Sequence, residues 1–186
     1  MGTRPLYSIG HGTRPLEVFL GLLKEHVIEY LIDVRTRPYS RFNPQYNRKA
    51  LEQSLGAVGI RYVFMGDTLG GRPEDPSCYT PDGRADYAVM RTKDLFLAGM
   101  ERLVKAHGTG CAVAMMCSES KPSECHRTRL IGQALAQANV PVMHIDERGM
   151  LSTQEMVLSE MQSGSQQVDL FSSPAFSTSI KRIRPV

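Results

Sequence analysis

The chain has 186 residues, of which 41% are hydrophobic and 22% are charged. This length is typical of one domain, and the composition excludes a globally disordered chain. The longest apolar runs are far shorter than the roughly 20 residues of a membrane-spanning helix, and the first residues lack the apolar core of a signal peptide. The net charge of +3 permits a nucleic-acid partner but is too small to indicate one.

The sequence contains four cysteines, at positions 78, 111, 117 and 125. Because no secretion signal is recognisable and the chain is long enough to bury a core, a disulfide framework is not expected. A reducing, cytoplasmic location fits this cysteine content best. Each cysteine is therefore a candidate for one of three roles: a buried core residue, a metal ligand or a reactive thiol.

In chain order, short apolar runs alternate with apolar stripes at three- and four-residue spacing, which predict strands and helices respectively. Strands are expected at residues 6–9, 30–34, 60–64, 111–117 and 140–145. Helices are expected at about residues 16–27, 48–58, 85–105, 122–138 and 153–162. The expected helix N-caps are Thr13, Asn47, Ser123 and Thr153. Residues 66–84 are rich in turn formers and are expected to form a long loop.

This alternation predicts an α/β fold: a single-domain, three-layer, Rossmann-like sandwich. Its mostly parallel sheet would have about five strands, with helices on both faces. We expect residues 1–163 to form the domain and the polar residues 164–186 to form a tail.

In such sheets the ligand binds beyond the carboxyl ends of the strands. His11 follows the first expected strand, and Asp33 and Arg35 lie at the end of the second. Cys117 ends the fourth strand and Glu119 follows it. We therefore expect these five side chains to converge on one cleft.

The segment CSESKPSECHR, residues 117–127, carries the most chemistry. With Ser123 as N-cap, Cys125, His126 and Arg127 fall in the first helical turn, where free amides and the helix dipole favour negative charge. A thiol there has a lowered pKa, and an anion such as phosphate would bind there too. The alternative is that Cys117 and Cys125 are small buried core residues.

A metal site is a third interpretation of the same segment, with Cys117, Cys125, His126 and His11 as ligands. The spacing of eight residues between the cysteines is wider than in most structural zinc sites. A cysteine and a histidine that are adjacent on a helix are also expected to point in different directions. We therefore predict no metal and no other cofactor.

Two further segments are candidates for catalysis and binding. His11, in a glycine turn, is expected to be exposed and to titrate near neutral pH as a general acid or base. The loop after Asp33 mixes arginines with aromatic residues, which suits phosphates and stacked bases; a solvated basic loop with an internal Asp33–Arg35 ion pair is the alternative. The predicted substrate-binding residues are Asp33, Arg35, Ser40, Arg41, Asn43, Gln45, Arg72, His126 and Arg127.

The tail contains QVDLF, residues 167–171, which resembles the short peptide by which bacterial DNA polymerases and repair proteins dock on the sliding clamp. Leu170 and Phe171 would fill an apolar pocket and Gln167 would fix the register. The alternative is that Leu170 and Phe171 fold back onto the domain.

Four segments in this order, SIGHGT, LIDVRTRPYSRFNPQYN, GIRYVFMGDTLGGRP and MMCSESKPSECHR, resemble the bacterial domain-of-unknown-function 488 family. The resemblance extends from about Leu6 to Ile145 and leaves the tail outside. It implies a small cytoplasmic α/β domain, but it implies no particular reaction, substrate or cofactor. It also implies that the segments selected above on chemical grounds are those that define the family.

We therefore predict an enzyme, a thiol-dependent hydrolase or transferase, that acts on a nucleic acid or nucleotide. Its catalytic residues would be Cys125, Cys117, His11 and Glu119. The alternative is a non-catalytic module that binds a nucleic acid or another anion and is recruited to the sliding clamp through its tail. Neither interpretation involves a membrane.

Overall fold

The computed structural model describes the backbone of residues 4–169 and the side chains of residues 4–163. Six strands in this range form one sheet in the order β3-β2-β4-β1-β5-β6. The first five are parallel, and β6 pairs antiparallel with β5. The strands are β1 (Leu6–Gly10), β2 (Tyr30–Asp33), β3 (Arg61–Phe64), β4 (Val113–Cys117), β5 (Val142–Ile145) and β6 (Leu151–Thr153).

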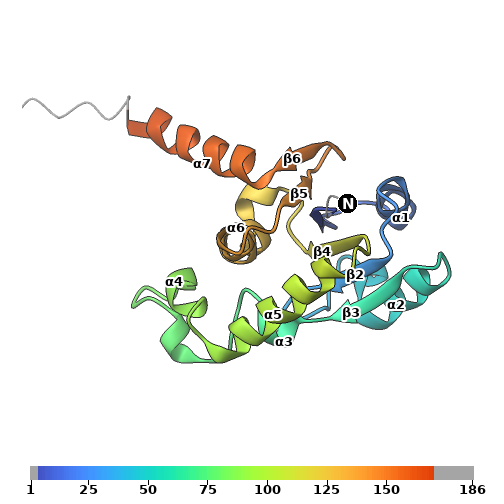
Figure 1. Cartoon of the computed structure of the whole chain (residues 1–186), viewed down its shortest axis with the longest axis horizontal. Helices are drawn as coiled ribbons and strands as arrows, with labels where there is room; N and C mark the ends of the chain where they lie inside the picture. The colour runs from blue at the N-terminus through green and yellow to red at the C-terminus, as the bar shows by residue number, and fades with distance from the viewer. Residues whose placement is uncertain (1–3, 170–186) are drawn as a thin grey trace, which may run out of the picture.

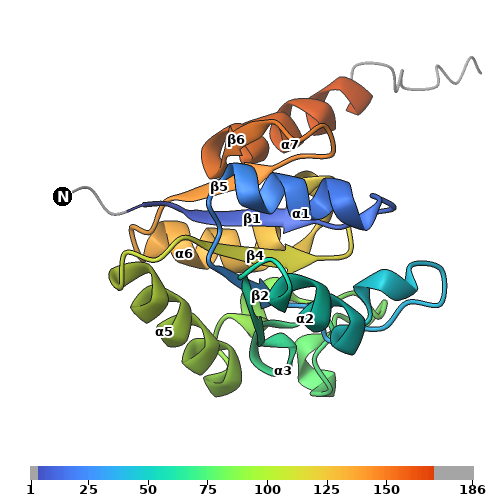
Figure 2. The same cartoon turned by 90° about the vertical axis from the view of Figure 1, so that its right-hand side faces the viewer.

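Helices cover both faces of this sheet, as Figures 1 and 2 show: α1 and α2 lie on one face, and α5 and α6 lie on the other. The helices are α1 (Leu16–Glu25), α2 (Arg48–Gly56), α3 (Gly66–Leu69), α4 (Tyr87–Met90), α5 (Asp94–Gly108), α6 (Gln133–Gln137) and α7 (Gln154–Asp169). The predicted α/β sandwich is therefore confirmed, with a short sixth strand that the sequence did not predict. Within residues 4–169 none of the helices is long and apolar enough to cross a membrane.

The side chains of β4 show how the sheet is buried on both faces. Val113, Met115 and Cys117 pack into the core on the α5 and α6 side. Ala114 and Met116 pack into the core on the α1 and α2 side. A parallel strand that is covered on both faces reads as a continuous apolar run, and this is why the sequence predicted it. Cys117 is therefore a core residue at the point where β4 ends.

Several predicted element boundaries are wrong. The helix predicted at 85–105 is two helices, α4 and α5, and the Thr92 hydroxyl between them donates to the Val89 carbonyl. The first helix ends at Glu25, because Val27 adopts a positive φ of 53°. The last helix continues to Asp169, so the predicted boundary at 163 falls within α7, and the division into domain and tail stays a prediction.

The predicted N-caps also had mixed outcomes. Thr153 caps α7, since its hydroxyl oxygen accepts a hydrogen bond from the Met156 amide. Asn47 precedes α2 as predicted, but its side chain accepts from the Ser40 amide instead of from the helix. Thr13 does not cap α1, which begins after Pro15 without a side-chain cap.

Gly10, at the end of β1, packs closely against the loop that follows β4, and a substitution at this position tests that packing. A Cβ at this position would overlap the backbone carbonyl of Glu119 and lie 2.9 Å from Arg127 Nη1. We expect Gly10→Ala to lower the free energy of unfolding by about 1–3 kcal/mol, the usual range for overpacking. Gly21 in α1 is the matched control, because a Cβ there meets nothing within 4 Å.

Gly21→Ala should raise the free energy of unfolding by up to about 1 kcal/mol, since alanine has the higher helix propensity. Urea denaturation of both variants measures the difference. Equal midpoints for the two variants would show that the Glu119 loop yields without cost.

Candidate functional site

Three neighbouring parallel strands, β2, β4 and β1, end at the same edge of the sheet, and the predicted site residues follow them. Gly10 of β1 is in register with Cys117 of β4, and Asp33 of β2 is in register with Met116. The His11 amide donates to the Cys117 carbonyl at 3.1 Å. The structure therefore brings His11, Asp33 and Cys117 to one edge.

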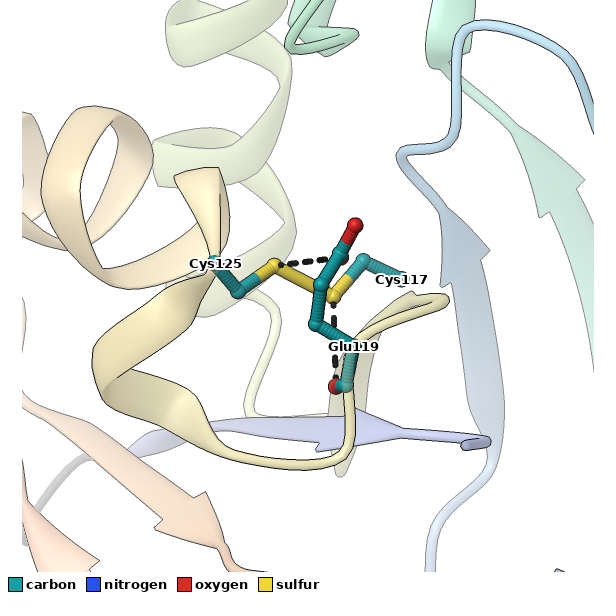
Figure 3. Close-up of side chains that lie close together, drawn as sticks. All are labelled: Cys117, Glu119 and Cys125. Atoms are coloured by element: carbon teal, nitrogen blue, oxygen red, sulfur yellow. Dashed lines mark hydrogen bonds between the residues drawn. A yellow bond between two sulfur atoms is a disulfide. The ribbon is translucent and has the colours of Figure 1, made fainter. Parts of the chain in front are cut away.

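Cys117 and Cys125 face each other and are joined by a disulfide, with Cα atoms 7.5 Å apart (Figure 3). The chain returns to the strand end through a 3-10 turn, Pro122–Glu124, which places Cys125 beside Cys117. Both side chains are buried, with exposed fractions of 0% and 1%. The alternative of buried core residues is therefore met, and the expectation that the cysteines form no disulfide is wrong for this pair, because the turn after β4 brings the two sulfurs together.

Glu119 is the polar neighbour of this pair, as Figure 3 shows. Its side-chain Oε2 lies 3.1 Å from Cys125 Sγ, and its backbone carbonyl oxygen lies 3.8 Å from Cys117 Sγ. Donor atoms of Cys117, Glu119 and Cys125 all lie within 4.8 Å of one another. The cluster therefore combines two buried sulfur atoms with one carboxylate that reaches solvent.

His126 also contacts this cluster, although adjacent cysteine and histidine residues were expected to point apart. Its Nδ1 lies 3.6 Å from Cys125 Sγ, and its Nε2 lies 3.1 Å from the Val34 carbonyl oxygen. A carbonyl oxygen can only accept, so Nε2 carries the hydrogen and Nδ1 keeps a lone pair towards Cys125. Burial lowers the pKa of His126, which keeps the ring neutral at pH 7.

The predicted N-cap, Ser123, is replaced in this role by Cys125 itself. Cys125 has extended backbone angles, and its carbonyl oxygen accepts from the amides of Thr128 and Arg129 in the π-helical turn Arg127–Gly132. The Arg127 amide approaches Cys125 Sγ at 3.4 Å. One helix-terminal N–H therefore points at the sulfur, an arrangement that stabilises a thiolate.

His11 is buried, which contradicts its predicted role as an exposed general acid or base. Its Nδ1 donates to the Gly12 carbonyl at 2.8 Å, and its Nε2 accepts from Arg35 Nη1 at 3.2 Å. The ring stacks on Tyr46 with centroids 4.2 Å apart. Burial lowers the pKa of His11 to about 4. His11 therefore remains neutral, and both of its nitrogens are used within the fold.

Asp33 and Arg35 form the internal ion pair that was the alternative to substrate binding. Arg35 donates through Nε to Asp33 Oδ1 at 2.9 Å and through Nη2 to Oδ2 at 2.6 Å. The Tyr62 hydroxyl donates to Asp33 Oδ2 at 2.8 Å, and the Tyr46 carbonyl accepts from Arg35 Nη2 at 2.8 Å. Asp33 is therefore fully used inside the protein and is not available to a ligand.

Arg127 was predicted to bind the substrate, but the structure places it in the interior of the protein. It is completely buried, and its Nη2 donates to the Ser120 carbonyl at 3.0 Å. Burial lowers its pKa to about 9. Arg127 therefore holds the loop after β4 in place through Ser120, and it is not one of the residues that line the neighbouring pocket.

A pocket of about 800 Å³ opens beside the cysteine pair. Its walls carry three arginines, Arg35, Arg37 and Arg72, and two of its lining residues, Glu119 and His126, also contact Cys125. The arginines make the pocket suitable for an anion. The cysteine pair is therefore adjacent to the pocket but does not line it, because Glu119 and His126, which contact Cys125, form the wall on that side.

The basic and aromatic loop flanks this pocket but does not line it beyond Arg37. Arg41 stacks over the Phe42 ring at 4.9 Å, and the side chains of Tyr39 and Phe42 are 73% and 81% exposed. Ser40 accepts from the Asn43 amide at 3.0 Å and so stabilises the loop. The remaining predicted residue of this loop, Gln45, is half-buried outside the pocket lining.

Seven residues of the pocket lining are not among the predicted site residues, namely Thr36, Arg37, Gly71, Pro73, Glu74, Tyr79 and Ser118. Thr36 and Ser118 directly follow Arg35 and Cys117, so the rule that ligands bind at strand ends could have found them. Glu74 and Tyr79 come from the 66–84 loop, where no periodic pattern indicates which side chains turn inward. Thr36 also accepts from the Arg72 amide at 3.1 Å, which fixes Arg72 over the pocket.

The predicted clamp-docking residues Leu170 and Phe171 lie outside the residues that the structure describes, and the side chain of Gln167 does too. Docking on the sliding clamp therefore stays a prediction.

The fold and the site together define a small parallel α/β protein with a cysteine-containing polar site at the carboxyl edge of its sheet. The model of the family described as Domain of unknown function DUF488 matches residues 15–134, and the chain belongs to this family. The matched segment contains Cys117, Cys125 and all three pocket arginines. No match was found among curated proteins or among solved structures.

Proposed function

We propose that this protein is a thiol-dependent enzyme that transfers or hydrolyses a group on a phosphate-bearing substrate. The observation that carries the proposal is the position of Cys125, whose sulfur contacts Glu119 and His126 where these two line a pocket with three arginines. A nucleophile, a base and an anion-binding surface are the parts that such a reaction needs.

The working form of the site is the reduced one, in the cytoplasm, where thiols stay reduced. His126 Nδ1 accepts the proton of the Cys125 thiol, because this nitrogen keeps its lone pair while Nε2 is bound to Val34. The thiolate then attacks a carbon or phosphorus atom of the substrate. The bond to the leaving group breaks, and the leaving group takes the proton from His126. Water or a second substrate then releases the group from the sulfur.

The pocket supports a nucleotide or a nucleic-acid end as the substrate class. Arg37 and Arg72 would neutralise phosphate charge, whereas the charge of Arg35 is balanced by Asp33. Tyr39 and Phe42 are exposed on the adjoining loop, where their rings could stack on the bases of a nucleic acid.

A screen of nucleotides and short oligonucleotides under reducing conditions tests this function. We expect Cys125→Ser to reduce turnover of an identified substrate by at least about a thousandfold, because the hydroxyl is a much weaker nucleophile than a thiolate. Cys111→Ser is the matched control, since Cys111 is a free cysteine at the opposite end of β4, and it should retain full turnover. Full activity of Cys125→Ser would refute the nucleophile assignment.

The burial of both sulfur atoms favours a second candidate, a binding module that uses the arginines and needs no thiol. The same Cys125→Ser variant separates the two. A binding module would bind the anionic ligand with unchanged affinity in this variant and would turn over no substrate in either form. Recruitment to the sliding clamp through residues 167–171 belongs to this candidate.

A further inference from the structure

The cluster of Cys117, Glu119 and Cys125 holds three groups that bind metal ions in their deprotonated, negatively charged form. The two sulfur atoms and the Glu119 carboxylate lie within 4.8 Å of one another. Within residues 4–163 Glu119 forms no ion pair; the buried Arg127 guanidinium acts on it through space and donates its hydrogen bond to the Ser120 carbonyl.

The position of the unpaired Glu119 carboxylate matters for the chemistry of Cys125. A carboxylate oxygen 3.1 Å from a buried sulfur disfavours a negative charge on that sulfur, because like charges repel, although solvent at the exposed Glu119 weakens this repulsion. A metal ion would reverse this effect, since a coordinated thiol loses its proton outright. The composition of the cluster therefore fits a bound cation better than it fits two free thiols.

We propose that the reduced site binds a zinc ion through Cys117 Sγ, Cys125 Sγ and a carboxylate oxygen of Glu119. Two thiolates select a soft, thiophilic metal over magnesium or calcium. Zinc bonds of about 2.3 Å to sulfur and 2.0–2.2 Å to oxygen place donor atoms about 3–4 Å apart on one ion. The donors of this cluster lie within 4.8 Å of one another, and the two sulfurs, which are bonded in the disulfide, move apart on reduction to reach that spacing. Three protein ligands would leave the fourth position for water or for a substrate group, as in catalytic zinc sites.

The eight-residue spacing of the cysteines does not count against this site. The 3-10 turn Pro122–Glu124 returns the chain to the end of β4, so the two sulfurs meet despite their separation in sequence. Beside them, His126 is oriented by its bond to Val34 with Nδ1 towards Cys125.

The zinc-bound form and the disulfide are two states of the same pair. A dithiol or phosphine reductant supplies two electrons, the S–S bond breaks, and each cysteine takes up one proton. Zinc then displaces these two protons and binds the two thiolates. This inference deepens the proposed function, because a zinc-bound Cys125 would remain a thiolate at neutral pH beside the arginine pocket.

The test uses the full-length protein, reduced with a phosphine under argon, stripped with a chelator and titrated with Zn²⁺ against a chromophoric chelator. We expect one zinc ion per chain. Cys117→Ser and Cys125→Ser should each weaken binding at least about 100-fold, and Glu119→Gln about 10-fold. Cys111→Ser should leave the zinc affinity unchanged. The zinc affinity of the wild-type protein should also be the same before and after one cycle of oxidation and reduction.

Titration with Co²⁺ gives a second readout, because each thiolate ligand adds a sulfur-to-cobalt absorption band. We expect this band in wild-type protein at roughly the intensity of two thiolates, and about half of it in Cys117→Ser. Absence of stoichiometric zinc in the reduced protein, or an equal loss in Cys111→Ser and Cys117→Ser, would overturn the site.

Zinc binding is measured without substrate, so its failure is distinct from that of the proposed function. If no zinc binds but Cys125→Ser abolishes turnover, only the zinc site is refuted. If zinc binds with the expected pattern but Cys125→Ser retains turnover, the zinc site stands and the nucleophile assignment fails.

Discussion

Replacing Arg35 with methionine is expected to lower the free energy of unfolding by about 3–5 kcal/mol. Arg35 is the partner of Asp33, whose carboxylate is completely buried and bonded to two guanidinium nitrogens at 2.9 and 2.6 Å. Removing the guanidinium leaves a buried negative charge with the Tyr62 hydroxyl as its remaining side-chain donor. His11 Nε2 and the Tyr46 carbonyl would lose a donor as well.

Arg37→Met is the matched control for Arg35→Met. Arg37 lines the same pocket but is exposed and, within residues 4–163, forms no ion pair, so its loss should change the free energy of unfolding by at most about 0.5 kcal/mol. Urea denaturation at pH 7 measures both variants. The double variant Asp33→Asn with Arg35→Met should recover part of the loss, because the uncompensated charge is gone. Equal stability of Arg35→Met and wild type would mean that water reaches Asp33.

This dual role of Arg35 affects how the pocket can be tested. A loss of activity in an Arg35 variant would combine the loss of an anion-binding group with disruption of the ion pair below it. Arg72 is attached to the fold through its backbone amide, which donates to Thr36, so its guanidinium can be removed without breaking a buried contact. Variants of Arg37 and Arg72 therefore measure anion binding more directly than variants of Arg35.

The fold could be predicted from the sequence because the strands of a doubly covered sheet are continuous apolar runs, as β4 is. The rule that ligands bind at strand ends also predicted that Asp33, Arg35 and Cys117 meet at one edge, since it depends only on strand direction. The rule could not predict which of these side chains would be buried. Asp33 is satisfied by Tyr62 from a different strand, a contact that the sequence does not encode locally.

The burial of His11 and Arg127 was not predicted, for the same reason. His11 is covered by Tyr46, which comes from a loop far along the chain, and Arg127 is covered by the segment after β4. Whether a polar side chain is exposed depends on what packs over it, and short-range patterns do not contain this information. The meeting of Cys117 and Cys125 depends in turn on the direction of one 3-10 turn.

Stability should also depend strongly on pH, because burial lowers the pKa of three histidines, His11, His126 and His144, in the folded protein. Burial lowers the pKa of His11 and of His144 to about 4 each. His144 accepts from the Ser8 hydroxyl at 2.6 Å and donates to Gln154 Oε1 at 2.7 Å, and protonation would break the first of these bonds.

In the unfolded chain the histidine pKa is about 6.5, so the unfolded state binds protons at a higher pH than the folded state does. The stabilisation is therefore complete above pH 6.5, is lost as the pH falls from 6.5 to 4, and changes no further below the folded-state pKa. Lowering one pKa from 6.5 to about 4 corresponds to about 3 kcal/mol, so two histidines account for about 6 kcal/mol, comparable to the total stability of a small domain.

We expect the urea midpoint to fall steeply between pH 6.5 and pH 4, and the protein to unfold near the lower end of this range without denaturant. His144→Gln should lose part of this pH dependence, because it removes one of the three histidines whose pKa burial lowers. The variant should be less stable than wild type at pH 7, because it lacks the hydrogen bonds of neutral His144 to Ser8 and Gln154. The difference in free energy of unfolding between the two proteins should become smaller at pH 5. A wild-type midpoint that is equal at pH 7 and pH 4.5 would contradict the burial of His11 and His144 in neutral form.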